Sequence, residues 1–497
     1  METLYRSTRE TASQTMTSSQ AVLQGLTPDG GLFVPVQLPT ANFDFDYLAT
    51  LSYQAVAYEV LKLFFTDYTE AELKACLKAA YGDQFDDPAI APVTKHGQQY
   101  YLELFHGPTI AFKDLALQLL PQLMLTAAKK NHLESEVVIL TATSGDTGKA
   151  AMAGFADVNQ TKIIVFYPKD GVSAIQKQQM VTQAGANTYV VALNGNFDDA
   201  QTKVKALLND PQLHAELAQN NLQFSSANSI NIGRLFPQVA YYVYTYAQLI
   251  KQGRIKNGDE INFSVPTGNF GDILAGYYAK QLGTPIHKLI CASNRNNVLT
   301  DFFNTGIYNK QRDFFLTSSP SMDILVSSNL ERLVFYLTGA NPVKTAGLMQ
   351  DLQTKGAYQL TPTMRQAITD FWAGFVTEDQ DQHEINHLYV HHHYTIDPHT
   401  AVASAVAKQY CAATKDQRPM VIVATASPYK FPQAVLTAIT GAPVTVDGLS
   451  AVDQLHDRIK TPIPATVTQL RTATVKHDRV SDPEQMATTI RQILHLT

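Results

Sequence analysis

The sequence has few cysteines, few charges and no long apolar run, and each absence excludes a class of protein. Its 497 residues include only 3 cysteines, which stand far apart without a CxxC pair. This excludes a disulfide framework and a thiolate zinc ribbon, and it is typical of a reducing cytosol. No window approaches the roughly 18 to 20 apolar residues that span a bilayer, and the charged first six residues are unlike a signal peptide. We therefore expect a cytoplasmic protein with no membrane partner.

Charge is scarce as well. Only 16% of the residues are charged, and 38 basic against 44 acidic side chains give a net charge of −6. A mildly acidic chain without a long basic run is a poor nucleic-acid binder, so we expect no nucleic-acid partner. What is present is a hydrophobic fraction of 45%, which at this length suits two or three globular domains.

Short apolar segments alternate with helical patterns through the middle of the chain. These segments have the length and composition of buried strands and lie at residues 136–141, 162–167, 188–193, 261–265, 288–292 and 420–424. Strands of this kind, separated by helices, predict a parallel sheet covered on both faces, with ligands at the carboxyl ends of the strands. The predicted fold class is therefore α/β.

The ends of the chain have a different pattern. Apolar residues at helical spacing over 48–58 and 73–80 predict helices near the N-terminus, and the Gly- and Pro-bearing stretch at 81–92 predicts a domain boundary. We expect an N-terminal domain at 1–92, a catalytic domain at 93–440 and a C-terminal extension at 441–497. The extension has a helical pattern at 483–496 and no evident chemistry.

Two turns with glycine follow predicted strands. The first, Thr-Ser-Gly-Asp-Thr-Gly at 143–148, opens a helix, and its hydroxyls and free amide hydrogens form a possible anion site. Taken alone, a plain capped strand-to-helix turn is the favoured explanation. The second, Pro-Thr-Gly-Asn-Phe-Gly-Asp at 266–272, lets the backbone approach a phosphate closely, but two glycines three apart are a weak signal.

A lysine in apolar surroundings is the third feature. Lys113 follows Phe112 and begins an apolar helix face, where desolvation would lower its pKa and leave an amine suited to Schiff-base chemistry. On pattern alone, a surface-reaching lysine paired with Asp114 is the commoner explanation. An amine, a phosphate cradle and an anion-binding turn together are nonetheless what pyridoxal phosphate and an amino-acid substrate require.

The chain resembles the threonine synthases, in their longer form with an extra N-terminal domain, within the tryptophan-synthase-β-like (fold type II) pyridoxal-phosphate enzymes. The resemblance runs in order to about residue 432. It is carried by motifs at 5–9, 25–35, 106–114, 142–148, 228–234, 266–271, 397–402 and 424–426. It implies a catalytic domain of two open, parallel-type α/β lobes with the cofactor in the cleft, and a mostly helical N-terminal domain. It also implies conversion of O-phospho-L-homoserine and water to L-threonine and phosphate.

The resemblance implies roles for individual residues. Lys113 matches the lysine that binds pyridoxal 5'-phosphate covalently, and Thr425 matches the hydroxyl residue that faces the pyridine nitrogen. The residues that match the cofactor-phosphate loop are Gly268, Asn269, Phe270 and Gly271, with Asp272 at the next position. Those that match the loop for the substrate carboxylate are Ser144, Gly145, Asp146, Thr147 and Gly148. For the substrate phosphate, the guanidinium of Arg234 is our candidate, with His106 and Asn231 as weaker ones.

Two positions depart from the family pattern. Ser427 stands where the family usually has a histidine close to the cofactor, which would alter the rate or the pH profile. Asp272 stands where asparagine is frequent, and because a carboxylate repels a phosphate, we expect its side chain to point away.

A rival interpretation comes from His383, Glu384 and His387, which satisfy the zinc-protease pattern HExxH, with His393 at the offset of a third ligand. Val390 stands where the longer pattern needs glycine. Six histidines crowd residues 383–399, so a chance match is favoured, and we expect an exposed helix that is not catalytic and no metal cofactor. Adventitious zinc or nickel binding at His383 and His387 remains open.

Three further questions stay open at this stage. A pyridoxal-binding scaffold without activity is disfavoured by the intact Lys113. Another fold type II lyase is disfavoured by the long N-terminal domain and by the His-Gly-Pro-Thr motif at 106–109. The sequence allows a monomer or a homodimer.

Overall fold

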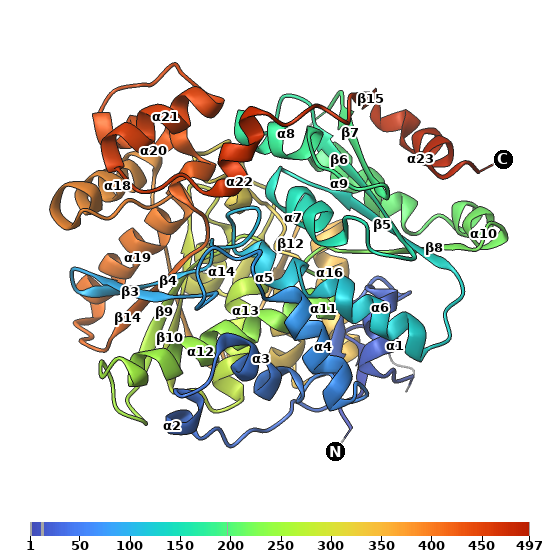
Figure 1. Ribbon diagram of the computed structural model, residues 1–497. Helices are drawn as coiled ribbons and strands as arrows, with labels where there is room; N and C mark the ends of the chain where they lie inside the picture. Colours follow the sequence, from blue (N-terminus) through green and yellow to red (C-terminus); the bar gives the residue numbers. More distant parts are fainter. Residues whose placement is uncertain (1, 11–13, 196, 497) are drawn as a thin grey trace.

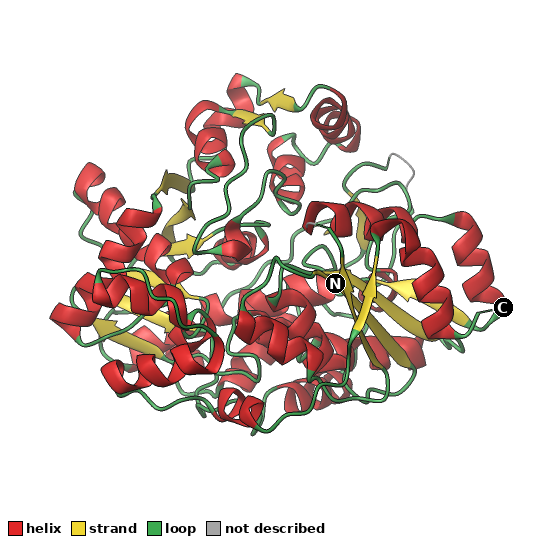
Figure 2. Ribbon diagram, turned by 90° about the horizontal axis from the view of Figure 1, so that it is seen from above, coloured by secondary structure: helices red, strands yellow, loops and turns green. Residues whose placement is uncertain are grey.

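Two sheets organise the computed structural model of the protein, which describes residues 2–10, 14–195 and 197–496. Figure 2 shows the sheets as separate groups of strands flanked by helices. The larger sheet has the order β13-β10-β9-β14-β4-β3 and is parallel except for the edge strand β3. Its strands are β3 (Val93–His96), β4 (Gln99–Glu103), β9 (Ile261–Pro266), β10 (Ile286–Ser293), β13 (Phe371–Phe375) and β14 (Met420–Ala424).

The smaller sheet is parallel throughout and has the order β15-β7-β6-β5-β8. Its strands are β5 (Glu136–Ala142), β6 (Thr161–Pro168), β7 (Thr188–Leu193), β8 (Leu222–Ser225) and β15 (Arg479–Ser481). The helices of this lobe are α7 (Asp146–Phe155), α8 (Ala174–Val181), α9 (Phe197–Leu207), α10 (Pro211–Gln219) and α23 (Met486–Leu494). All six predicted strands are present, and the prediction of an α/β fold with two parallel lobes is confirmed.

The larger sheet is covered on both faces. Helix α12 (Pro237–Lys251) is buried from Pro237 to Leu249 and shares one apolar core with β9 and α13 (Gly271–Gln281). On the other face lies α19 (Pro398–Thr414), followed outward by α18 (Glu378–His392) and α20 (Pro432–Thr440). The remaining elements of the lobe are α11 (Ile232–Leu235), α14 (Val298–Thr305), β11 (Ile307–Asn309), the short 3-10 helix η1 (Pro320–Met322), α15 (Leu330–Leu337), α16 (Pro342–Thr354), β12 (Ala357–Gln359), α17 (Pro362–Gln366) and the 3-10 helix η2 (Pro428–Lys430).

Some of the N-terminal helices pack directly on α12. The N-terminal segments comprise β1 (Tyr5–Ser7), α1 (Ser18–Gln24), β2 (Phe33–Pro35), α2 (Phe45–Leu48), α3 (Tyr53–Leu61) and α4 (Glu70–Ala80), followed by α5 (Lys113–Leu117) and α6 (Leu120–Lys130). The ring of Phe64 stacks on Phe236 at 4.1 Å, so the apolar core of these helices continues into the larger lobe. The helical pattern predicted over 48–58 is interrupted, because Ser52 caps the start of α3.

The C-terminal segment connects the two lobes (Figure 1). It runs from α21 (Gly448–Ile459), which packs on α20, through α22 (Ala465–Thr468) and the 3-10 helix η3 (Gln469–Arg471) to β15. Strand β15 then joins the smaller sheet beside β7, and η4 (Pro483–Gln485) leads into α23. Among the described residues, no helix has the length and apolar character needed to cross a membrane.

Candidate active site

A cavity between the lobes collects most of the predicted site residues. Its walls include the segments that follow β5, β9 and β14, so the cavity lies at the carboxyl ends of parallel strands, as the sequence predicts. The predicted residues that line it are Lys113, Ser144, Asp146, Thr147, Arg234, Gly268, Asn269, Gly271, Asp272 and Thr425.

Lys113 is buried at the first turn of α5 and faces this cavity. Its Nζ donates to Oδ2 of Asp146 over 3.3 Å and to Oγ of Ser321 over 3.2 Å. Asp114 does not pair with it, because that carboxylate accepts hydrogen bonds from the backbone N–H and hydroxyl of Thr109. The surface-reaching lysine is therefore the wrong explanation. Burial lowers the pKa of Lys113, as expected, although the charge of Asp146 opposes the shift.

The turn at 266–272 is built to admit an anion. Phe270 has a left-handed backbone (φ 66°), and Gly271 begins the 11-residue helix α13, whose first amides are free of partners in the helix. A methyl group at Gly268 would lie 2.5 Å from the backbone oxygen of Ser321, so only glycine fits there. These features suit the phosphate of pyridoxal phosphate.

Asp272 lies at the same turn and lines the cavity rather than turning away from it. Its Oδ1 accepts the backbone N–H of Ile273 over 2.8 Å. Burial raises the pKa of Asp272 to about 6, against the opposing effects of its backbone hydrogen bonds and of Lys113 and Arg234. A carboxyl group with a raised pKa accepts a proton more readily, which reduces its repulsion of a phosphate.

The glycines of the turn at 143–148 serve the backbone geometry of the turn itself. Oγ1 of Thr143 accepts the backbone N–H groups of Gly145 and Gly148 over 3.0 and 2.9 Å. Gly145 has φ 123°, and a Cβ there would lie 2.5 Å from the side chain of Gln176. Ser144 lines the cavity, whereas the two glycines do not.

Asp146 acts as a counter-ion in this turn. Besides Lys113, it contacts Nζ of the fully buried Lys430 at 3.3 Å and accepts from Nε2 of Gln176 over 2.7 Å. Burial alone would raise the pKa of Asp146, but the two lysines outweigh it and hold that pKa well below its usual range. The carboxylate is therefore ionised and already paired.

The three residues considered for the substrate phosphate lie in different places. Arg234 is buried on α11, lines the cavity and donates from Nη1 to the backbone oxygen of Ala227 over 3.0 Å. Burial lowers its pKa to about 10. Asn231 caps α11 through Gly233 N–H, and His106 lies between two carboxylates; neither of these two side chains lines the cavity.

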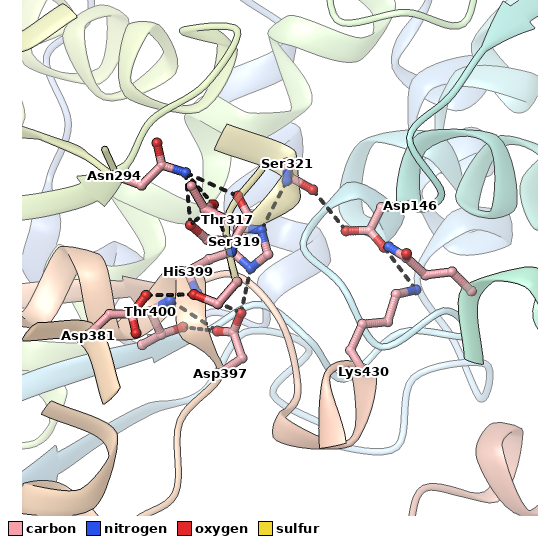
Figure 3. Close-up of polar contacts among 12 residues, drawn as sticks. Asp146, Asn294, Thr317, Ser319, Ser321, Asp381, Asp397, His399, Thr400 and Lys430 are labelled. Carbon is pink, nitrogen blue, oxygen red and sulfur yellow. Dashed lines mark hydrogen bonds and ion pairs between the residues drawn. The ribbon is translucent and has the colours of Figure 1, made fainter. Parts of the chain in front are cut away.

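Three cavity residues were missed by the sequence analysis or given no role. His399 and Ser321 line the cavity, and Lys430 reaches its edge through Asp146 (Figure 3). Lys430 also donates to the backbone oxygen of Thr109 over 2.9 Å. His399 belongs to the motif at 397–402, so a signal existed for it, whereas Ser321 has no local pattern that identifies it.

The histidines of α18 do not form a catalytic zinc site. Glu384 is buried, and its carboxylate accepts from Oγ of Ser404 and from Nζ of Lys408, each over 2.7 Å. Such a carboxylate is not free to act as the base that the HExxH pattern requires. In the part of the chain that the structure describes, no group of three His, Cys, Asp or Glu residues could hold a metal ion.

The fold and the cavity define a class, the pyridoxal-phosphate-dependent enzymes of fold type II. The family model described as "Pyridoxal-phosphate dependent enzyme" matches residues 90–426. Two narrower models, "Threonine synthase N terminus" and "Threonine synthase, C-terminal", match residues 4–81 and 400–474. The chain belongs to the threonine synthase family, which confirms the resemblance.

Individual relatives agree. Threonine synthase of Pseudomonas aeruginosa is 37% identical over 488 residues, covering 96% of this chain and 99% of the relative. The Saccharomyces cerevisiae enzyme is 35% identical, with 88% and 89% covered. Human "Threonine synthase-like 1" is 39% identical over 85% of this chain, but the chain spans only 58% of that relative.

Solved structures show the same fold. Pyridoxal-phosphate-bound threonine synthase from Brucella melitensis superposes with a TM-score of 0.87 at 35% identity, covering 99% of this chain and 98% of that chain. Threonine synthase from Escherichia coli has a TM-score of 0.76 at 27% identity, covering 99% and 100%.

Proposed function

We propose that the protein converts O-phospho-L-homoserine and water to L-threonine and inorganic phosphate, the last step of threonine biosynthesis, with pyridoxal 5'-phosphate as cofactor. The observation that carries this proposal is the buried amine of Lys113, facing a glycine-lined anion cradle across one cavity in a chain of the threonine synthase family. The bound cofactor supplies an electron sink for the charge that develops on the substrate.

Lys113 would hold the cofactor covalently, and its amine, once free, would take the proton from the substrate Cα. Its burial favours this role, because a lowered pKa keeps a larger share of the amine unprotonated and able to accept a proton. Asp146 and Ser321 then stabilise the resulting ammonium through the contacts described above.

Gly268, Asn269, Phe270 and Gly271 would hold the cofactor phosphate at the start of α13, where the amides of a helix N-terminus favour an anion. Thr425 lines the cavity after β14, where its hydroxyl would face the pyridine nitrogen of a bound cofactor. A neutral hydroxyl at this position leaves that nitrogen largely unprotonated. With a pKa raised only to about 6, the Asp272 carboxyl is still mostly ionised near neutral pH, so the nearby charges of Lys113 and Arg234 would offset its repulsion of a bound phosphate.

The substrate binds the remaining residues that line the cavity. Because Asp146 is an ionised counter-ion and the amides of Gly145 and Gly148 are bonded within their turn, the substrate carboxylate binds the hydroxyls of Ser144 and Thr147. Arg234 binds the substrate phosphate, since it retains guanidinium donors beyond its contact with Ala227.

His106 and Asn231 contribute to the scaffold instead. Both side chains are committed to contacts outside the cavity lining, so the proposal assigns the substrate phosphate to Arg234 alone among the three candidates.

The test is an end-point assay on the purified holoenzyme with O-phospho-L-homoserine, in which phosphate and threonine are both quantified. Equal amounts of the two products, lost in Lys113→Ala, support the proposal. Threonine-free phosphate release, or neither product from protein that is visibly loaded with cofactor, contradicts it. The latter result favours another amino-acid lyase of the same fold, or a binding scaffold without activity.

A further inference from the structure

Ser321 completes a triangle of polar atoms at the reactive amine. Nζ of Lys113 donates to Oγ of Ser321 over 3.2 Å, and that hydroxyl donates to Oδ2 of Asp146 over 3.1 Å. Asp146 also accepts directly from Lys113 over 3.3 Å. Because the hydroxyl hydrogen is directed at the carboxylate, an oxygen lone pair of Ser321 is left for the amine.

The backbone of Ser321 is held by a second pair of residues. Its N–H donates to Nε2 of His399 over 3.2 Å, and Nδ1 of His399 lies 2.7 Å from Oδ2 of Asp397 (Figure 3). A backbone N–H can only donate, so Nε2 is the acceptor and carries no hydrogen. The ring hydrogen is then on Nδ1 and is donated to Asp397, which fixes one tautomer.

This pair is rigid and buried. His399 is 3% exposed and Asp397 is fully buried. Asp397 also caps α19, where its Oδ1 accepts the backbone N–H of Thr400 over 3.1 Å. His399 is thus anchored to the start of a long helix rather than to a loop.

The turn around Ser321 is fixed from its other side as well. Asp323 accepts from the backbone N–H and the hydroxyl of Thr317 over 3.0 and 2.7 Å, and from Nδ2 of Asn294 over 2.8 Å. The backbone oxygen of Ser321 meanwhile packs against Gly268 of the anion cradle. The backbone and hydroxyl of Ser321 are therefore held by contacts from several separate parts of the chain.

We propose that Ser321 is a catalytic residue of this cavity, whose hydroxyl orients the amine of Lys113 for proton transfer, and that His399 and Asp397 are positioning residues that hold Ser321 in place. The inference rests on the proposed role of Lys113. In the transfer, the Nζ lone pair forms the new N–H bond and the electrons of the broken C–H bond stay on the substrate carbon. The ammonium so formed finds two acceptors in place, the Ser321 oxygen and the Asp146 carboxylate.

The first measurement needs no substrate. Protein freed of cofactor is mixed with pyridoxal 5'-phosphate, and the visible absorbance of the covalently bound form is followed over time. Ser321→Ala is expected to capture the cofactor roughly tenfold more slowly than the unchanged protein, with the same final stoichiometry, because the amine is no longer oriented. The matched control is Ser318→Ala, since Ser318 lies in the same segment but donates to Asp381. It should capture the cofactor at the unchanged rate.

The second measurement isolates the proton transfer. A phosphonate analogue of O-phospho-L-homoserine, in which a methylene replaces the ester oxygen, is incubated with the holoenzyme in deuterium oxide. Exchange of the Cα hydrogen is followed by proton NMR. Ser321→Ala should slow this exchange by roughly tenfold or more, and Ser318→Ala should not.

His399 is tested by non-additivity. His399→Leu removes the acceptor for the Ser321 N–H and should slow cofactor capture like Ser321→Ala, while the double variant should be no slower than either single one. If the double variant instead slows capture by the product of the two single fold-changes, His399 does not act through Ser321 and the positioning role is overturned.

The outcomes separate the two proposals. Capture by Ser321→Ala within about twofold of the unchanged protein overturns the inference, as does an equal slowing by Ser318→Ala. A third outcome is slowed capture in Ser321→Ala while the unchanged protein neither exchanges the Cα hydrogen of the analogue nor forms threonine. This outcome contradicts the proposed substrate, but it still supports the role of Ser321 at Lys113.

Discussion

The guanidinium of Arg332 donates from Nε to the backbone oxygen of Phe33 over 2.9 Å, and this contact ties the N-terminal strand β2 to α15. Arg332 is fully buried and also donates to the backbone oxygen of Ile230 and to the side-chain oxygen of Asn329. Asn329 in turn donates to the backbone oxygen of Asn269 in the anion cradle over 3.0 Å. The N-terminal domain thus supports the site without lining it.

Replacing Arg332 should destabilise the whole protein. Arg332→Met leaves three buried acceptors without a donor, and each such loss costs about 1–3 kcal/mol. We expect unfolding free energy to fall by roughly 3–5 kcal/mol, with weaker cofactor binding. Denaturant unfolding and a cofactor titration measure the two effects. Arg471→Ala, which breaks only an exposed pair with Asp453, is the control. A loss no larger than that of the control would contradict the account.

His106 should make stability depend on pH. Burial alone lowers its pKa, but hydrogen bonds with Asp86 at 2.6 Å and Glu103 at 3.1 Å outweigh this and raise the pKa to about 9. A folded-state pKa above the unfolded value near 6.5 gives stability that is full below that value and is lost as pH rises through about 9.

His106→Gln should therefore destabilise the protein by roughly 2 kcal/mol at pH 6 and by much less at pH 10. Unfolding curves at both pH values measure the difference in unfolding free energy between the variant and the unchanged protein. The control is His214→Gln, which removes a contact with the backbone oxygen of Leu208 instead of a contact with a carboxylate. If the loss of unfolding free energy in His106→Gln is the same at both pH values, the ring is not held in its charged form.

Ser427 should matter for local stability and little for the reaction. The side chain is buried and accepts the backbone N–H of Tyr429 over 3.3 Å, and it does not line the cavity. Ser427→Ala should cost about 1 kcal/mol, as loss of a cap does, and leave kcat within about twofold. Steady-state kinetics and a melting curve check this. A tenfold fall in kcat at unchanged Tm would restore the sequence-based expectation that this position tunes the chemistry.

A chelator should leave the reaction unchanged. The only HExxH pattern has its glutamate bound to Ser404 and Lys408, so no step of the proposed chemistry passes through α18. Activity before and after exhaustive treatment with EDTA should agree within error. Loss of activity that zinc restores, and that His383→Ala also produces, would reinstate a metal site on this helix.

The sequence predicts those helices and strands whose pattern lies within one short stretch of residues. Residues 188–193 and 420–424 are short apolar runs, the first between two asparagines and the second between Pro419 and Thr425, and they form β7 and β14 with the predicted bounds. The break between α2 and α3 escapes the same reasoning, because apolar spacing continues across it while Ser52 caps a new helix. The motif at 266–271 likewise predicts a turn that opens a helix, and α13 begins there at Gly271.

The rest of the site is non-local. Ser321 and His399 meet across 78 residues, and Lys430 reaches Thr109 across 321. Spacing along the chain does not encode such contacts, which arise where separate loops converge on one cavity. Asn231 shows how a polar side chain inside a strong motif can also serve the fold, because it caps α11 and does not line the cavity.

The most direct test of the account is to locate the cofactor on the chain. The holoenzyme is reduced with borohydride, which fixes pyridoxal phosphate to the amine that holds it, and the digested peptides are sequenced by mass spectrometry. The account predicts one modified residue, Lys113, and no modification in Lys113→Ala. Modification of Lys430 or Lys149, the lysines buried nearby, or of none, would contradict it.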